Sequence, residues 1–174
     1  LIVNLNIYSI CIFDNIFIDI GDEQSLENDL STYSSHLNNM KFFLKNGNHS
    51  TLLIIDEFGS GTEPLIGGAI AEAELNRFNE NKCFGVINTH YTNLKHFANH
   101  TEGVVNGAML YDRHLMKPLF QLSIGNPGSS FAVEIARKIG LPEDVINHAA
   151  EIVGKEHLEY DKNLQDIVRD KRYW

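Results

Sequence analysis

Apolar positions along the chain follow two spacings, one typical of strands and one typical of helices. Short apolar runs at Ile7–Ile12, Thr51–Ile55 and Cys83–Ile87 predict three strands. The last two runs are almost continuously apolar, which is typical of strands buried on both faces of a sheet. Asp14-Asn15, a turn-prone pair, follows the first run.

Between these strands the apolar residues recur at helical spacing. The clearest case is Ser31–Leu44, where Ser31 suits the N-cap, Gly47 the stop, and one stripe holds Tyr33, Leu37, Met40 and Leu44. Pro64 suits the first turn of a second helix, Leu65–Asn79, with a small-residue face of Gly68, Ala69 and Ala73. Further helices are predicted over Thr92–His100, from the Asn126-Pro127-Gly128-Ser129 turn to Ile139, and from Leu141-Pro142-Glu143 onward.

Two more strands, Val104–Tyr111 and Leu115–Ile124, flank Asp112-Arg113-His114 and predict a hairpin. The order strand–helix–strand with short apolar strands predicts an α/β fold, with a mainly parallel sheet flanked by helices and an antiparallel addition. Function in such sheets gathers at the carboxyl ends of the strands. We therefore expect the functional residues to follow directly after the strands.

Composition narrows the function classes without naming one. No apolar run is long enough to cross a bilayer. The formal net charge of −9 argues against this piece gripping nucleic acid by itself, because phosphate binding needs clustered Lys and Arg. Cys11 and Cys83 lie in apolar surroundings and are interpreted as small buried hydrophobic residues rather than a disulfide or metal pair, which fits a cytoplasmic protein.

Two strand ends carry candidate chemistry. Asp56-Glu57 follows Thr51–Ile55, and such a pair can hold Mg²⁺ and activate a water for nucleotide hydrolysis, although two solvated acids at a strand end are equally common. Gly59-Ser60-Gly61-Thr62 comes next, a flexible loop able to approach phosphates or a facing subunit. His90 follows the next strand, where an imidazole could bond a γ-phosphate or the lytic water; a surface or core histidine is the alternative.

These segments resemble the ATPase domain of the MutS family. Leu53–Pro64 resembles its Walker B strand and D-loop, and Asn88-Thr89-His90-Tyr91 resembles its switch-histidine motif. Ile20–Ser25 and Leu30–His36 resemble its signature region and are closer to the second bacterial branch, whose full-length members often end in a Smr nuclease domain. The motifs occur in family order from about Phe13 to Ala150.

The resemblance implies an ABC-type P-loop NTPase-like fold, ATP and Mg²⁺ as cofactors, and a role for each matching residue. Asp56 would serve the Mg²⁺ ion, Glu57 would be the catalytic carboxylate and His90 would sense the γ-phosphate. Ser31 and Thr32 would contact ATP held by the opposite subunit, since a helix N-terminus offers free N–H groups. Gly59, Ser60 and Gly61 form the loop at the same site.

One family element is missing from the sequence. There is no Gly-x-x-x-x-Gly-Lys-Ser/Thr; the single Gly-Lys pair, Gly154-Lys155, has no P-loop glycine before it. We therefore interpret residues 1–150 as the C-terminal part of a MutS-like ATPase domain without its Walker A segment, either as a fragment, which we favour, or as a chain whose other half was lost. We expect this chain alone to bind ATP weakly or not at all and to hydrolyse none. Residues 151–174 predict a charged helical tail, either a solvated helix end or the start of a coiled coil.

The sequence is compatible with three functions. The leading one is part of an ATP-hydrolysing DNA clamp that works as a homodimer, in mismatch repair or on branched and recombining DNA, with DNA held by parts of the protein outside this chain. For the second branch, stalled ribosomes are a further implied partner. The alternatives are a non-hydrolysing dimerisation module with a degenerate ATP site, and a transporter ATPase, which would need an LSGGQ-type signature that Leu30-Ser31-Thr32-Tyr33-Ser34 does not supply.

Overall fold

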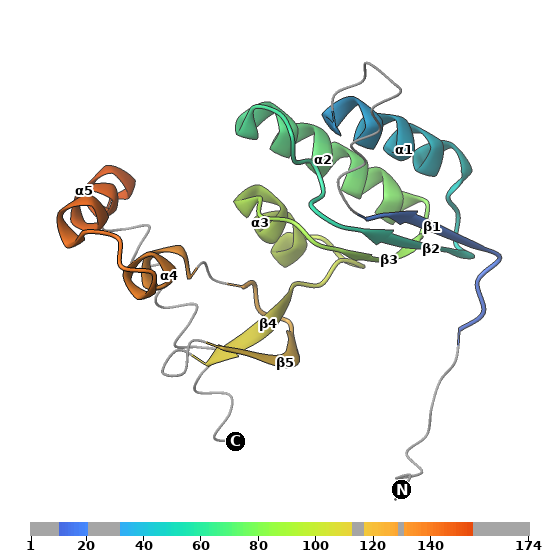
Figure 1. Ribbon diagram of the computed structural model, residues 1–174. Coiled ribbons are helices and arrows are strands. Elements are labelled where there is room, and N and C mark those ends of the chain that lie inside the picture. The colour runs from blue at the N-terminus through green and yellow to red at the C-terminus, as the bar shows by residue number, and fades with distance from the viewer. Residues whose placement is uncertain (1–10, 21–31, 113–116, 129–130, 155–174) are drawn as a thin grey trace, which may run out of the picture. The chain divides into compact units, whose positions relative to one another are not determined.

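The computed structural model describes residues 11–20, 32–112, 117–128 and 131–154. The chain forms two compact units, residues 1–103 and 104–174, shown in Figure 1. The first unit holds a parallel three-stranded sheet of order β1-β2-β3, formed by Asn15–Asp19, Thr51–Ile55 and Phe84–Ile87. Its helices are α1 (Thr32–Asn46), α2 (Pro64–Glu80) and α3 (Thr92–His100). The predicted α/β fold with a parallel sheet is confirmed.

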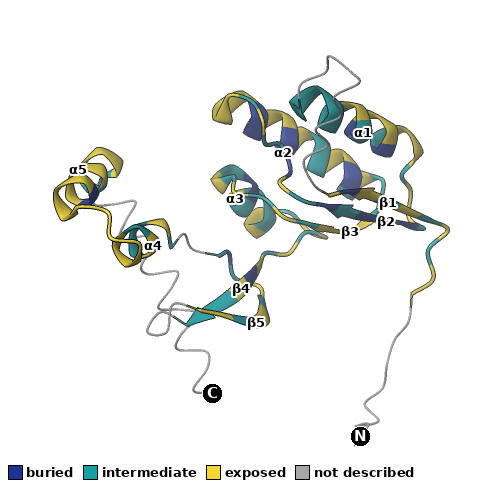
Figure 2. Ribbon diagram, viewed as in Figure 1, coloured by how far each residue is buried: buried dark blue, intermediate teal, exposed yellow. Residues whose placement is uncertain are grey.

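One face of this sheet is packed into a core. Helices α1 and α2 cover that face (Figure 1), and Figure 2 shows their buried inner positions. The buried cluster consists of Met40, Phe43, Leu53, Ile55, Phe58, Ala71, Phe78 and Leu94. Removing apolar side chains of this size from water stabilises a fold by about 1.5–3 kcal/mol each, so this cluster anchors the strand ends where function is expected.

The other face of the sheet is apolar and open. Each strand contributes two residues in register: Ile16 and Ile18, Leu52 and Ile54, Phe84 and Val86. On the two outer strands these side chains are exposed, from 51% for Phe84 to 70% for Val86. The prediction that β2 and β3 are buried on both faces is therefore wrong for the part of the chain that the structure describes, where helices cover one face only.

The first strand that the structure describes begins after the predicted one. Strand β1 begins at Asn15, whereas the prediction was Ile7–Ile12, of which residues 7–10 lie outside the described ranges and Cys11 and Ile12 are not in a strand. The pair Asp14-Asn15 does not form the predicted turn, because Asn15 pairs with Thr51 and both backbone N–H groups donate to the Ser50 carbonyl, at 2.9 and 3.4 Å. Pairing with β2 overrides the local preference of Asn.

Helix α1 agrees with its predicted bounds, but its packing is displaced. Met40 and Phe43 are buried, and Leu44 packs partly against the core, while Tyr33 and Leu37 are only half-buried. The second half of α1 therefore makes most of its apolar contacts with the sheet.

Helix α2 also agrees with its predicted bounds. Glu63 caps it by accepting the N–H groups of Leu65 and Ile66 at 3.0 and 2.9 Å, which lowers the pKa of its carboxyl. The predicted small-residue face is wrong in part: Ala69 and Ala73 are exposed, and the buried small residues are Gly67, Gly68 and Ala71. The helix is rotated so that Gly67 meets the loop after β2, where an added Cβ would lie 2.9 Å from the Gly59 carbonyl oxygen.

The second unit confirms the predicted hairpin and the two helices after it. Strands β4 (Gly107–Asp112) and β5 (Lys117–Ile124) pair antiparallel, with residues 113–116 outside the described ranges. Helix α4 (Ala132–Lys138) leads to α5 (Glu143–Val153), and Arg137 bonds Glu143 at 3.1 Å. The tail from residue 155 onward also lies outside the described ranges.

Two sequence-based expectations concern the whole chain. Cys11 is exposed and Cys83 is half-buried, so the buried interpretation is wrong for Cys11, which precedes β1 instead of lying in a strand; both thiols are free. Within the described ranges, none of the helices is both long and apolar enough to span a bilayer.

Candidate functional site

Three polar residues stand side by side at the carboxyl edge of the sheet. Asp19 ends β1, Asp56 follows β2 and Asn88 follows β3. The backbone ladder continues through them: the Asp56 N–H donates to the Asp19 carbonyl, and the Asn88 N–H donates to the Ile55 carbonyl, both at 2.9 Å. These residues are therefore held in place by backbone hydrogen bonds that continue the sheet.

Asp56 has one carboxylate oxygen that is free to bind a ligand. Its Oδ1 atom accepts the Asn88 Nδ2–H at 2.6 Å and the Glu57 backbone N–H at 3.1 Å. Its Oδ2 atom accepts no hydrogen bond from the described residues. The side chain is oriented by its neighbours and is half-buried, yet it keeps one oxygen for a ligand.

Glu57 marks the point where the chain turns out of the sheet. Its backbone has a φ of +49°, a left-handed conformation that residues other than glycine rarely adopt and that gathers at functional sites. Its carbonyl accepts the Ser60 N–H at 2.9 Å, which closes a tight turn. The side chain is exposed, so its carboxylate is accessible to water and solutes.

The loop after this turn is fixed by close contacts that only glycine permits. Gly59 has a φ of +82°, and a Cβ there would lie 2.8 Å from the Tyr91 ring and 2.9 Å from Ala71. The Tyr91 hydroxyl donates to the Gly59 carbonyl at 2.9 Å. Gly61, with a φ of +90°, lies against the backbone of Tyr33 at the start of α1. The loop thus lies between α1 and the segment after β3.

The remaining predicted site residues have fewer described contacts at the sheet edge. Thr89 donates its hydroxyl to the Phe58 carbonyl at 3.1 Å and so ties the segment after β3 to the turn. His90 is exposed and, within the described ranges, makes no hydrogen bond or ion pair with Asp56 or Glu57. Thr32 is half-buried and begins α1, while Ser31 lies outside the described residues.

Sequence reasoning missed a buried polar cluster at the end of β1. Asp19 is 7% exposed; its Oδ2 lies 2.6 Å from Nδ1 of His36, and its Oδ1 accepts Nδ2–H of Asn39 at 3.0 Å. The signal was present, because His36 and Asn39 fall one helical turn apart in the predicted helix. Asp19 was missed because β1, the strand that it ends, was not predicted at this place.

Glu74, an acid on α2, is partly buried and lies close to Tyr33 of α1. Burial raises the pKa of Glu74, on α2, to about 7. Tyr33 of α1 has its own pKa raised, first by burial and then by the neighbouring Glu74 carboxylate and by Tyr91. The Tyr33 hydroxyl is buried and has no hydrogen-bond partner in the part of the chain that is described.

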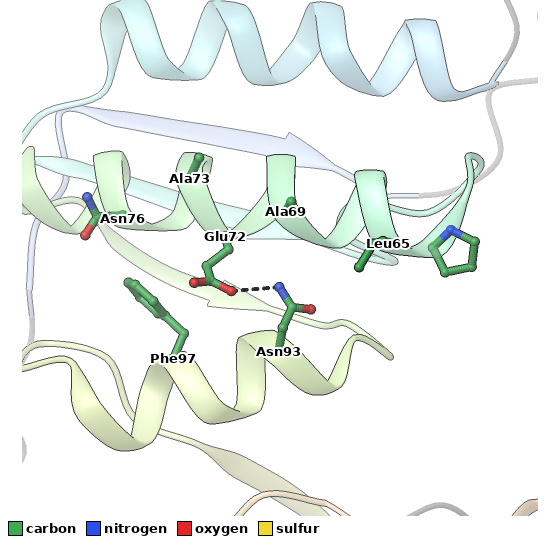
Figure 3. Close-up of a pocket in the computed structure, with 8 residues that line it drawn as sticks. Leu65, Ala69, Glu72, Ala73, Asn76, Asn93 and Phe97 are labelled. Atoms are coloured by element: carbon green, nitrogen blue, oxygen red, sulfur yellow. Dashed lines mark hydrogen bonds between the residues drawn. The ribbon is translucent and has the colours of Figure 1, made fainter. Parts of the chain in front are cut away.

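A shallow groove between α2 and α3 is separate from this edge. It has a volume of about 530 Å³, and Asn93 donates to the Glu72 carboxylate across it at 2.8 Å, as Figure 3 shows. Its other lining residues are Pro64, Leu65, Ala69, Ala73, Asn76 and Phe97. None of the predicted site residues lines it, so it is not part of the candidate site.

The described residues at the sheet edge fit a Mg²⁺ ion shared with a phosphate better than a metal ion bound by protein side chains alone. The described residues contain no group of three or more His, Cys, Asp or Glu side chains that could hold an ion together. Mg²⁺ in phosphate-handling sites is bound by one or two carboxylates together with phosphate oxygens and water. The free Oδ2 of an otherwise oriented Asp56 fits that requirement.

A parallel sheet with helices on one face, acids at its carboxyl edge and a glycine-rich turn defines part of a P-loop ATPase-like α/β domain. The family follows from comparison: residues 2–157 match MutS domain V, and the chain belongs to the MutS family.

Proteins named Endonuclease MutS2 are similar over most of this chain. The one from Caldanaerobacter subterraneus is 41% identical over 163 residues, which cover 94% of this chain and 20% of the relative. Those from Clostridioides difficile and Thermomicrobium roseum are each 42% identical, over 94% and 91% of this chain and 21% and 20% of the relative. The chain thus spans about one fifth of the length of these relatives. The expected MutS resemblance, closest to the second branch, is confirmed.

Proposed function

We propose that this chain supplies the hydrolytic side of a MutS-type ATP site. Asp56 would hold Mg²⁺ through its free oxygen, and the ion would neutralise charge on the phosphates. Glu57 would orient or deprotonate the attacking water, and His90 would bond the γ-phosphate. The observation that carries this proposal is the pairing of a fixed, half-used Asp56 with an exposed Glu57 on a left-handed turn.

The same chain would act on the ATP of a second copy. Thr32 begins α1, and Ser31 directly precedes it in the sequence. The described first turn of this helix contains no acidic residue to offset the positive end of its dipole. The Gly59-Ser60-Gly61 loop lies next to that turn, against Tyr33. Both features would meet the partner subunit's nucleotide in a homodimer.

For the whole protein we propose an ATP-driven clamp on mismatched or branched DNA. The family supports this role, and the relatives are named as endonucleases. The net charge of −9 on this chain supports placing the DNA contacts in other parts of such a protein. ATP binding and hydrolysis at the dimer-composite site would drive the clamp between states.

The test uses a chimera, because the 174-residue chain alone is expected to hydrolyse no ATP. The matching fifth of the Clostridioides difficile relative is replaced by this chain, and steady-state ATP hydrolysis is measured beside the unmodified relative. Glu57→Gln in the chimera is expected to lower kcat about 100-fold or more while ATP still binds. Glu102→Gln, on an exposed loop residue, is the matched control and should leave kcat unchanged.

Two results would count against the proposal. If the chimera binds ATP and hydrolyses none, the segment is a non-hydrolysing dimerisation module with a degenerate site. If Glu57→Gln hydrolyses at the rate of the unsubstituted chimera, Glu57 is not the catalytic carboxylate. Glu57-dependent hydrolysis by the isolated chain would overturn the expectation that it is inactive alone.

A further inference from the structure

The buried carboxylate of Asp19 holds the first half of α1. Both of its oxygens are used, Oδ2 with His36 at 2.6 Å and Oδ1 with Asn39 at 3.0 Å. The side chains of Asp19 and His36 are only 8% and 11% exposed. A carboxylate removed from water this far needs such partners, because leaving it unpaired would be costly.

The apolar core does not hold this half of the helix equally well. The buried residues of α1, Met40 and Phe43, both lie in its second half, where Phe43 stacks on Phe17 of β1 at 5.2 Å between ring centres. From Thr32 to Leu37 every residue is only half-buried. The contacts of Asp19 with His36 and Asn39 are therefore a specific polar attachment of this half of the helix to the sheet.

The attached face of the helix also carries Thr32. Thr32, His36 and Asn39 are spaced by four and three residues, which places them on one face of a helix. A bond to His36 fixes both the rotation and the axial position of the first turn. The backbone of Asp19 meanwhile accepts the Asp56 N–H at 2.9 Å, so the same residue is bonded to the helix that carries Thr32 and to the strand end that carries Asp56.

We propose that Asp19 is a positioning residue that acts in trans, through His36 and Asn39. It holds the first turn of α1 in the place from which Thr32 reaches the ATP of the second subunit. Since its backbone also bonds Asp56, it links the metal-binding strand of one ATP site to the contact made with the other. This inference rests on the proposed trans role of Thr32.

Mixed dimers of the chimera separate action in trans from action in cis. In the reference dimer one subunit carries Glu57→Gln, so only the other subunit hydrolyses ATP, and it uses the first subunit's α1. Adding Asp19→Ala to the Glu57→Gln subunit is expected to lower the remaining turnover about 10- to 100-fold, as small misplacements of a catalytic contact do. Adding Asp19→Ala to the hydrolysing subunit instead should leave the rate close to that of the reference.

The controls address folding. Phe78→Leu, which alters the buried core at the far end of α2, is placed in each subunit in turn and should lack this dependence on placement. Asp19→Asn keeps one oxygen to accept from Asn39 and replaces the other by an NH₂ group, which can donate to Nδ1 of His36 when that nitrogen is unprotonated, and it should restore part of the rate. In the 174-residue chain, Asp19→Ala should shift the ring-nitrogen NMR signals of His36.

A loss of turnover that follows the hydrolysing subunit, a loss in both placements, or no loss in either, would overturn the inference. An unchanged His36 signal would overturn the contact on which it rests. Failure of the proposed function looks different, because the reference dimer itself would then show no turnover.

Discussion

The pKa of Glu74 offers a direct test of how α1 and α2 pack. Its carboxyl is partly withdrawn from water on α2, and burial raises its pKa from 4.5 to about 7. It lies close enough to Tyr33 of α1 for its charge to raise the pKa of the tyrosine as well. Glu74→Gln removes the titrating group while keeping nearly the same shape.

The sign of the effect follows from proton binding. Between pH 4.5 and 7 the folded chain keeps a proton on Glu74 that the unfolded chain releases, so the stability of the natural chain falls as pH rises through this range. Below pH 4.5 both states are protonated and the two proteins should be similar. A shift from 4.5 to about 7 corresponds to at most about 3 kcal/mol. Because the carboxyl keeps some contact with solvent, we expect Glu74→Gln to stabilise the chain by about 1–2 kcal/mol at pH 8.

Urea unfolding of both proteins at a series of pH values measures this difference. The gain should be near zero at pH 4, grow between pH 4.5 and 7, and stay constant above. Ala73→Gln, on the exposed side of the same helix, changes no titrating group and should give a difference that does not vary with pH. A Glu74→Gln gain that is equal at pH 4 and pH 8, or larger at pH 4, would refute the reasoning.

Two further predictions concern surfaces. Cys11 is exposed, whereas Cys83 is half-buried and burial raises the pKa of its thiol. A maleimide should therefore label Cys11 about 10-fold faster or more, as followed by peptide mass spectrometry. Equal labelling rates would contradict the burial of Cys83. The open apolar face of the sheet should make the isolated chain self-associate, and Val86→Lys, on that face, should weaken association in sedimentation experiments. Leu65→Lys, equally apolar and exposed but on α2, is its control and should have little effect.

Local pattern was enough to predict most elements. Thr51–Ile55 is a strand as predicted, and the helices agree within one or two residues, because their apolar spacing and end signals agree with each other. Residues 7–10 of the predicted Ile7–Ile12 strand lie outside the described ranges. Strand β1 was missed because it begins within a turn-prone pair, Asp14-Asn15, and only its pairing with β2 shows it to be a strand. The second face of the sheet was misjudged for a related reason: an apolar strand shows what it can bury and does not show what covers it.

Only part of the candidate site could be predicted from the sequence. Asp56 and Glu57 were identified from their place after an apolar run, and the structure places both at the carboxyl end of β2. Asn88 belongs to the Asn88-Thr89-His90-Tyr91 motif, yet its bond to Asp56 needs two strands in register, which no single segment reveals. The roles of Asp56, Glu57, His90 and Thr32 all stay predictions, since their proposed contacts are with a nucleotide, its metal ion or the attacking water.

The structure also separates two acids that look alike in the sequence. Asp19 and Asp56 both end apolar strands, both stand at the same edge, and the backbone of one bonds the backbone of the other. Asp19 gives both carboxylate oxygens to side chains of α1 and is 7% exposed, so a metal ion could bind it only after α1 is released. Asp56 gives one oxygen to Asn88 and its own turn, and the other receives no hydrogen bond from the described residues. The difference in unused oxygens, rather than the presence of an acid, is what favours Asp56 as the metal ligand and leaves Asp19 to hold the helix.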